Sequence, residues 1–127
     1  MNNVLSSFVT VKEMLTDRGI NCDKLDCISD NELNIMSKTN NIFKLDVNDT
    51  LKIIYYMNAK FKINDLKKFF SENDKVLIIF KEKINNLNIK NLKDQDVKSV
   101  EIFNIRELLF NISKHILMLF ISKTQRI

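Results

Sequence analysis

The sequence predicts an α/β domain in which helices pack on a mixed β-sheet. Apolar residues recur at helical spacing over the first 40 residues. After residue 50, apolar runs typical of strands alternate with segments of helical periodicity, which is the order expected of an α/β layer structure. At 127 residues, of which 45% are hydrophobic, the chain can bury one core but is too short for two domains of ordinary size.

The first predicted helix begins near Val4 and ends at Gly19. Val4, Phe8, Val11 and Leu15 form one apolar stripe at helical spacing. Gly19, the only glycine of the chain, can adopt the left-handed conformation that terminates helices.

A second helix is predicted over residues 30–39. Ser29 followed by Glu32 fits a capping box, and Ile28 can pack on Leu33 across the first turn.

The remainder of the chain alternates between the two kinds of element. Alternating or continuous apolar runs predict strands at 43–47, 51–57, 75–81 and 100–105. Helical spacing predicts a helix that Asn64 caps and that ends near Asn73-Asp74, a helix at 84–93 and a helical turn at 107–110. We expect the core to contain Phe8, Val11, Leu15, Ile53, Tyr55, Leu77, Ile79 and Phe103.

Charge and cysteine content limit the classes of function only weakly. With 20 Lys and Arg against 16 Asp and Glu, the net charge of +4 permits nucleic-acid binding but is more typical of a solvated lysine-rich surface. Neither a membrane span nor a secretory signal is evident. We therefore expect reduced cysteines, no membrane partner, and a location in the nucleus, the cytoplasm or a virion.

Candidate metal ligands are few. Cys22, Cys27 and His115 could supply three ligands, but zinc usually takes four and prefers a closer cysteine pair. With a single glycine, the chain has neither a phosphate-cradling loop nor a nucleophile elbow. We expect no bound cofactor or metal.

An acidic pair with a lysine loosely resembles the site of metal-dependent nucleases. Asp46, Asp65 and Lys67 are the residues concerned, and in such enzymes carboxylates hold Mg²⁺. Asp65 and Lys67 fall on a predicted helix instead of a strand, so we expect no catalytic residue here.

Two segments resemble a known family. Thr10-Val11-Lys12-Glu13-Met14-Leu15-Thr16-Asp17-Arg18-Gly19 is similar to the first helix of the fifth subunit shared by eukaryotic RNA polymerases, which has the form Thr-Val-x-x-Met-(Leu/Val)-x-Asp-Arg-Gly. The matching positions are Thr10, Met14, Asp17, Arg18 and Gly19.

The second similar segment lies far downstream. Glu101-Ile102-Phe103, Leu108, and Asn111-Ile112-Ser113-Lys114-His115-Ile116-Leu117 resemble the family's Glu-x-Phe and Asn-Ile-(Thr/Ser)-x-His-x-Leu segments, in the same order. The matching positions are Glu101, Phe103, Asn111 and His115. The resemblance covers roughly residues 4–118 and is specific only at its two ends.

The resemblance implies a fold and a function. The fold would be a three-layer α/β/α structure with a mixed sheet and a topology like that of restriction endonucleases, without a nuclease site. The function would be that of a non-catalytic jaw domain of a DNA-directed RNA polymerase, which acts in transcription beside incoming DNA. Its partners would be the largest subunit and other polymerase subunits.

Contact with downstream DNA would be weak and independent of sequence. Lys12 and Arg18 would touch phosphates, with further scattered lysines such as Lys38, Lys60 and Lys62. Arg18 also has an alternative structural role, since Asp17 and Arg18 could hold the turn at 21–26 through local hydrogen bonds.

The sequence departs from the family after residue 118. The family continues into a C-terminal assembly domain, whereas residues 119–127 form a divergent tail after the jaw-like domain at 1–118. A fragment, a disrupted gene and a short version of the kind a large DNA virus carries all fit this departure. A stand-alone protein-interaction module and a nuclease-like domain remain alternative functions.

Overall fold

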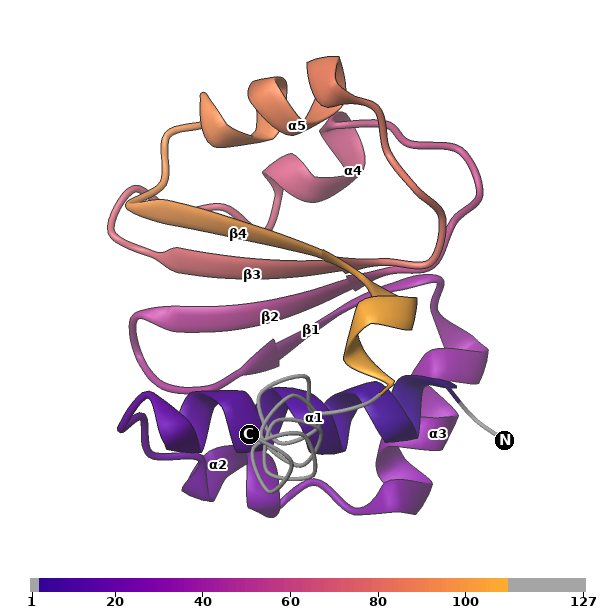
Figure 1. The fold of residues 1–127 in the computed structure, drawn as a ribbon, viewed down its shortest axis with the longest axis vertical. Coiled ribbons are helices and arrows are strands. Elements are labelled where there is room, and N and C mark those ends of the chain that lie inside the picture. Colours follow the sequence, from indigo (N-terminus) through magenta and orange to yellow (C-terminus); the bar gives the residue numbers. More distant parts are fainter. Residues whose placement is uncertain (1–2, 110–127) are drawn as a thin grey trace, which may run out of the picture.

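The computed structural model describes residues 3–109 and contains a four-stranded mixed sheet (Figure 1). The strands lie side by side in the order of the sequence: β1 (Ile42–Asp46), β2 (Leu51–Tyr56), β3 (Lys75–Phe80) and β4 (Ser99–Asn104). β1 is antiparallel to β2, whereas β2, β3 and β4 are parallel to one another. The predicted α/β class with a mixed sheet is confirmed.

Helices cover both faces of this sheet and give it three layers (Figure 1). One face carries α1 (Asn3–Asp17), α2 (Asp23–Asp26), α3 (Asp30–Thr39) and the short 3₁₀ helix η1 (Ile105–Leu108). The other face carries α4 (Asn64–Lys67) and α5 (Asn86–Lys93). Among these described residues, no helix is both long enough and apolar enough to cross a membrane.

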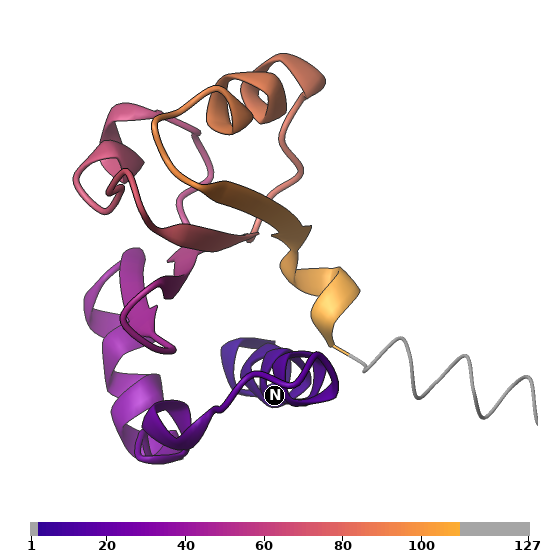
Figure 2. The ribbon, with the colours of Figure 1, turned by 90° about the vertical axis from the view of Figure 1, so that its left-hand side faces the viewer.

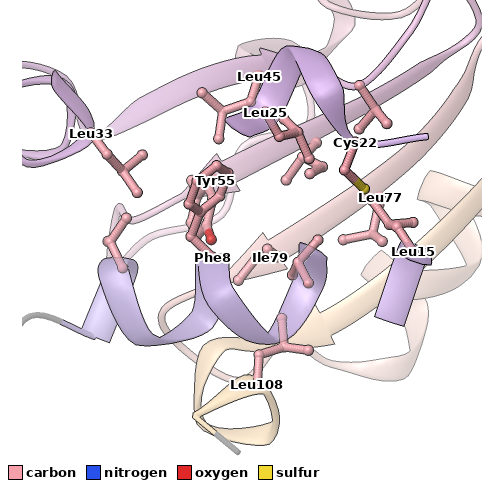
Figure 3. Close-up of a cluster of buried hydrophobic side chains, with 14 of the residues drawn as sticks. Phe8, Leu15, Cys22, Leu25, Leu33, Leu45, Tyr55, Leu77, Ile79 and Leu108 are labelled. Atoms are coloured by element: carbon pink, nitrogen blue, oxygen red, sulfur yellow. The ribbon is translucent and has the colours of Figure 1, made fainter. Parts of the chain in front are cut away.

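The two central strands are buried on both faces. Side chains of β2 and β3 alternate between the two sides, so that Ile53 and Leu77 face α1 while Ile54 and Ile78 face α4 and α5. Figure 3 shows the cluster on the α1 side, where Phe8, Leu25 and Leu33 meet the sheet. Burial on both faces explains why these strands read as continuous apolar runs.

The expected core residues are buried, with one exception. Phe103 packs against the α1-side cluster but stays partly exposed. The reason is its position on β4, which lies at the edge of the described sheet and has a neighbouring strand on one side only.

The helix termini follow the predicted chemistry at Gly19 and, for one of the two bonds of the capping box, at Ser29. Gly19 has a φ of 81°, and the N–H of Ile20 donates to Leu15 O at 2.9 Å, which closes the end of α1. At the start of α3, Ser29 Oγ accepts from the N–H of Glu32 at 3.1 Å. The Glu32 carboxylate accepts from the Ser29 hydroxyl at 3.3 Å and not from the Ser29 N–H, so the second bond of the predicted capping box is not formed.

Several predicted elements have slightly different bounds, and for two of them the hydrogen bonds show the reason. The helix expected to end near Asn73-Asp74 is regular only in α4, because the N–H groups of Phe69 and Phe70 bond three residues back and tighten the chain into turns. The expected cap at Asn64 is wrong, since Asn64 is the first residue of α4 and no side chain caps this helix. The turn expected at 107–110 begins earlier as η1. Asn104 is the last residue of β4 and caps η1. Its side chain accepts from Arg106 N, and its own N–H donates to Glu107 Oε1.

Candidate functional site

The two segments that carry the family resemblance are joined by an ion pair. Arg18 Nη1 donates to Glu101 Oε1 at 2.6 Å, and Nη2 donates to Oε2 at 3.0 Å, across 83 residues of sequence. This hydrogen bonding raises the pKa of Arg18 above its already high ordinary value, although partial burial opposes the rise. The guanidinium and the carboxylate therefore form a two-point contact between the end of α1 and β4.

The structural role that the sequence suggested for Arg18, which was to hold the turn at 21–26 through local hydrogen bonds, is wrong. The guanidinium binds Glu101, and the turn that follows is held by other groups, among them Asn21 Oδ1, which accepts from Asp23 N at 2.8 Å. Arg18 directly follows α1, and Glu101 is the third residue of β4, so the side chain of Arg18 connects the end of the helix to the sheet.

A cleft of about 430 Å³ surrounds this ion pair at the amino-terminal ends of β3 and β4. Three cationic side chains line it, Arg18, Lys75 and Lys98, against the single carboxylate of Glu101. Both lysines are exposed. The remaining wall is largely apolar, with Leu15, Ile20, Leu51, Val76 and Leu77. The cleft is thus a cationic surface suited to an anionic group.

Backbone bonds fix the strand ends that carry these lysines. The N–H of Lys75 donates to Thr50 O at 2.6 Å, and the N–H of Lys98 donates to Asp74 O at 2.8 Å. The Asp74 carboxylate is itself nearly buried and pairs with Lys52, with Nζ and Oδ2 2.6 Å apart. Lys52 Nζ also donates to Phe69 O at 3.1 Å. This buried pair ties β2 to the loop that precedes β3.

The other residues of the resemblance have mainly structural positions. Thr10 is buried and donates to Ser6 O at 3.3 Å, and Met14 and Phe103 pack against the α1-side cluster. Gly19 forms the helix end described above, and Asp17 is exposed beside it. Asn111 and His115 lie outside the described residues, as does the tail at 119–127.

The lysines expected to contact DNA are dispersed. Lys12 pairs with Asp26 at 3.4 Å and lies over the ring of Phe8, with Nζ 4.8 Å from the centroid. Lys38, Lys60 and Lys62 are exposed, on α3 and in the loop after β2, and do not line the cationic cleft. Of the two phosphate-contact residues named from the sequence, only Arg18 lies in the cleft.

The suggested nuclease residues occupy separate elements. Asp46 ends β1 and pairs with Lys44 at 3.4 Å, whereas Asp65 and Lys67 belong to α4. Asp65 accepts from the hydroxyl of Tyr56 at 3.3 Å. Burial raises the pKa of Tyr56, and the neighbouring Asp65 charge raises it further.

The suggested zinc ligands are also not assembled. Cys22 is buried, Cys27 is exposed, and both are free thiols, while His115 falls beyond residue 109. Across residues 3–109, no group of three or more His, Cys, Asp and Glu side chains could hold a metal ion.

Lys75 and Lys98 are site residues that the sequence prediction missed. Each stands at or directly before the first residue of a strand, and Lys75 is in register with Ser99. The first residues of neighbouring parallel strands lie at the same end of a sheet. The two lysines could therefore have been placed together if parallel pairing had been assumed.

No family model, curated protein or solved structure matches this chain.

Proposed function

We propose that the chain is a non-catalytic jaw domain of a multisubunit DNA-directed RNA polymerase. The observation that carries this proposal is the bidentate contact between Arg18 and Glu101. Each belongs to one of the two segments that resemble the polymerase subunit, and nothing in their local sequence requires them to meet. The restriction-endonuclease-like topology without a nuclease site is part of the same proposal, as is a location in the nucleus, or in the cytoplasm or virion of a virus.

The cationic cleft is the surface that we assign to downstream DNA. Lys75 and Lys98 reach solvent beside Arg18, and phosphates could approach them without any base being read. Such binding is electrostatic, so the dissociation constant should be about 10⁻⁴–10⁻⁶ M at physiological salt.

The polymerase assignment is tested by copurification. A tagged chain expressed in its source should recover the largest polymerase subunit. The matched pair of variants is Arg18→Glu, which reverses a charge at the motif, and Lys24→Glu, which reverses an exposed charge on α2. Recovery of the largest polymerase subunit should fall with Arg18→Glu and persist with Lys24→Glu. If the folded wild-type chain brings down only unrelated proteins, the stand-alone interaction module becomes the better function.

The DNA contact is tested by salt dependence. Removal of two phosphate contacts in a Lys75→Gln, Lys98→Gln variant should lower the magnitude of the slope of log K against log salt by up to about 2. A Lys38→Gln, Lys60→Gln variant removes the same charge from exposed positions outside the cleft. Equal slopes in the two variants would contradict the cleft assignment, and cleavage of the duplex with Mg²⁺ would favour the nuclease-like alternative.

A further inference from the structure

The described part of the sheet has an open edge at β4. Among residues 3–109 this strand pairs with β3 alone, so the backbone groups that point away from β3 are available to another strand. A groove of about 490 Å³ lies against β4 and is lined by five consecutive residues, 100–104. Side chains of consecutive residues point to opposite faces of a sheet. A groove that touches all five therefore follows the edge of the strand and not one face.

Apolar side chains beside this edge are covered incompletely on both faces of the sheet. Val100 and Ile102 pack against the cluster on the side of α4 and α5, whereas Phe103 packs against the α1-side cluster, and all three stay partly exposed. Figure 2 shows α5 on one side of β4 and η1 on the other. Ile89 of α5 also lines the groove and is partly exposed. A strand added here would cover these residues only if it carried apolar side chains on both of its faces.

The charges along the groove balance one another. Glu82 and Glu107 stand against Lys83 and Lys93, and the remaining charged residue, Glu101, already holds the ion pair described above. The groove therefore attracts neither a basic nor an acidic segment. Its charge and its partly covered apolar side chains together favour an occupant that is uncharged and apolar.

An uncharged apolar segment is present in the same chain. Residues 116–121 have the sequence Ile-Leu-Met-Leu-Phe-Ile, six consecutive apolar residues. Because alternate residues of a strand point to opposite faces, such a run presents apolar side chains on both faces. Its length equals that of β4, which also has six residues.

The path of the chain brings this segment within reach of the edge. η1 begins directly after β4, and the described residues end at 109, five residues beyond the last residue of β4. The six residues 110–115 can span about 20 Å when extended, which is about the length of a six-residue strand. A parallel strand would need a crossover back to the amino end of β4, so a direct connection makes the added strand antiparallel.

We propose that residues 116–121 bind the open edge of β4 as an antiparallel fifth strand of the sheet. Their backbone would pair with the outward N–H and C=O groups of β4, and their side chains would cover the partly exposed apolar residues on both faces. The sheet would then end in a strand that belongs to the same chain.

The proposal gives a position to the remaining residues of the family resemblance. Asn111 and His115 belong to the connection 110–115 and would lie near the carboxyl end of β4. The proposal does not depend on the polymerase assignment, because it follows from the edge, the groove and the apolar run.

The test is amide hydrogen exchange of the whole chain, followed by NMR. Alternate N–H groups of an edge strand point outward, and the others point toward β3. The outward groups of β4 should exchange at least about tenfold more slowly in the wild-type chain than in a Leu117→Lys, Leu119→Lys variant, because two charges in the segment oppose its binding. The inward groups should stay protected in both chains and thereby show that the variant is folded.

A matched variant tests whether the position of the charges matters. Gln125→Lys, Ile127→Lys adds two lysines at the same spacing outside the apolar run. It should leave the exchange of the outward groups as slow as in the wild-type chain.

Nuclear Overhauser contacts in the wild-type chain provide a measurement that needs no variant. Backbone protons of residues 116–121 should contact those of β4 in antiparallel order, with Ile116 near the carboxyl end of β4 and Ile121 near its amino end. If the variant with two lysines in the run unfolds, the inward groups lose their protection, and these contacts decide the question.

Several outcomes would overturn the proposal. These are outward groups that exchange equally fast in the wild-type chain and the variant with two lysines in the run, equal loss of protection in both double variants, and contacts of residues 116–121 with another surface. In a mixture of labelled and unlabelled chains, contacts between copies would show that a second copy occupies the edge, which also contradicts the proposal.

Discussion

Arg18 and Glu101 connect parts of the chain that are far apart in sequence, yet both side chains remain 44–45% exposed. Solvent exposure screens the two charges, so most of the free energy that the pair contributes to stability comes from its two parallel hydrogen bonds. A lysine at position 18 would keep the charge and lose that geometry, since an ammonium group is a point donor and not a fork.

Double-mutant analysis should measure this contact. Arg18→Met and Glu101→Gln, alone and combined, should give a coupling free energy of about 0.5–1 kcal/mol by chemical denaturation. The Lys24–Asp49 pair serves as the control, because its side chains are 61% and 98% exposed and 3.6 Å apart. Its coupling should be close to zero, and comparable values for both pairs would show that Arg18 gains nothing from bidentate bonding.

The two tyrosines are adjacent and point to opposite faces of the sheet. Tyr55 shares a hydrogen bond of 2.8 Å with Ser7 on the α1 side. Tyr56 donates to Lys60 O at 2.9 Å and accepts from Lys62 N at 2.8 Å on the other side. Burial raises the pKa of both phenols, and in Tyr55 the bond to Ser7 opposes the rise only in part.

Alkaline pH should therefore unfold the chain. Both folded-state pKa values are raised above the unfolded value of about 10. The stability from the neutral phenols is complete below pH about 10 and is lost as pH rises toward the folded-state values. Phenolate absorbance and far-UV circular dichroism should change together, and the two tyrosines supply the whole phenolate signal. Ionisation well before the loss of secondary structure would contradict the buried positions.

At the scale of the elements, α3 depends on its amino-terminal cap. Ser29→Ala removes the acceptor for the N–H of Glu32 and should lower the free energy of unfolding by about 1 kcal/mol. Ser71→Ala, in the loop between α4 and β3, is the matched exposed control and should change it by less than about 0.5 kcal/mol. Similar losses in the two variants would mean that the Ser29 hydroxyl does not cap the helix.

The sequence predicted the strands well because β2 and β3 are buried on both faces. Their apolar runs leave little alternative to a central strand, and Gly19 and Ser29 mark helix ends by local chemistry. The four residues of α2 were not predicted, since Leu25 is its only buried residue and one apolar position defines no period. The end of α4 was placed too late, because Phe69 and Phe70 continue its apolar pattern within turns.

The candidate site was predicted in part. Arg18 and Glu101 were both named from the resemblance, but their contact was not. It depends on where α1 crosses the sheet, and local sequence does not encode that position. Lys75 and Lys98 were missed because their proximity follows from the parallel pairing of β3 and β4, and apolar runs alone do not distinguish parallel from antiparallel pairing.

At the scale of the whole molecule, two apolar cores share a single sheet. The α1-side core and the α4–α5-side core both use β2 and β3, and neighbouring residues of one strand belong to different cores. Loss of either core exposes one face of the same strands, so the two should unfold as one cooperative unit.

The tyrosines make this cooperativity measurable, since Tyr55 reports on one core and Tyr56 on the other. In Tyr56→Phe, fluorescence comes from the α1-side core, and in Tyr55→Phe it comes from the opposite core. Within each variant, the denaturant midpoint from fluorescence should coincide with that from circular dichroism. A separation of the two midpoints in either variant would reveal cores that unfold independently.

Strand order also has a kinetic consequence. Each strand of the sheet pairs with the next one in the sequence, so pairing can proceed stepwise over connections that are much shorter than the separation of Arg18 and Glu101. The contact between Arg18 and Glu101 instead closes a loop of more than 80 residues, and such closure is entropically costly until the intervening strands are in place. We therefore expect the ion pair to form after the rate-limiting barrier. Its removal should speed unfolding and leave the folding rate nearly unchanged. The contact between the first helix and the last described strand would therefore lengthen the lifetime of the folded chain without changing how fast the chain folds.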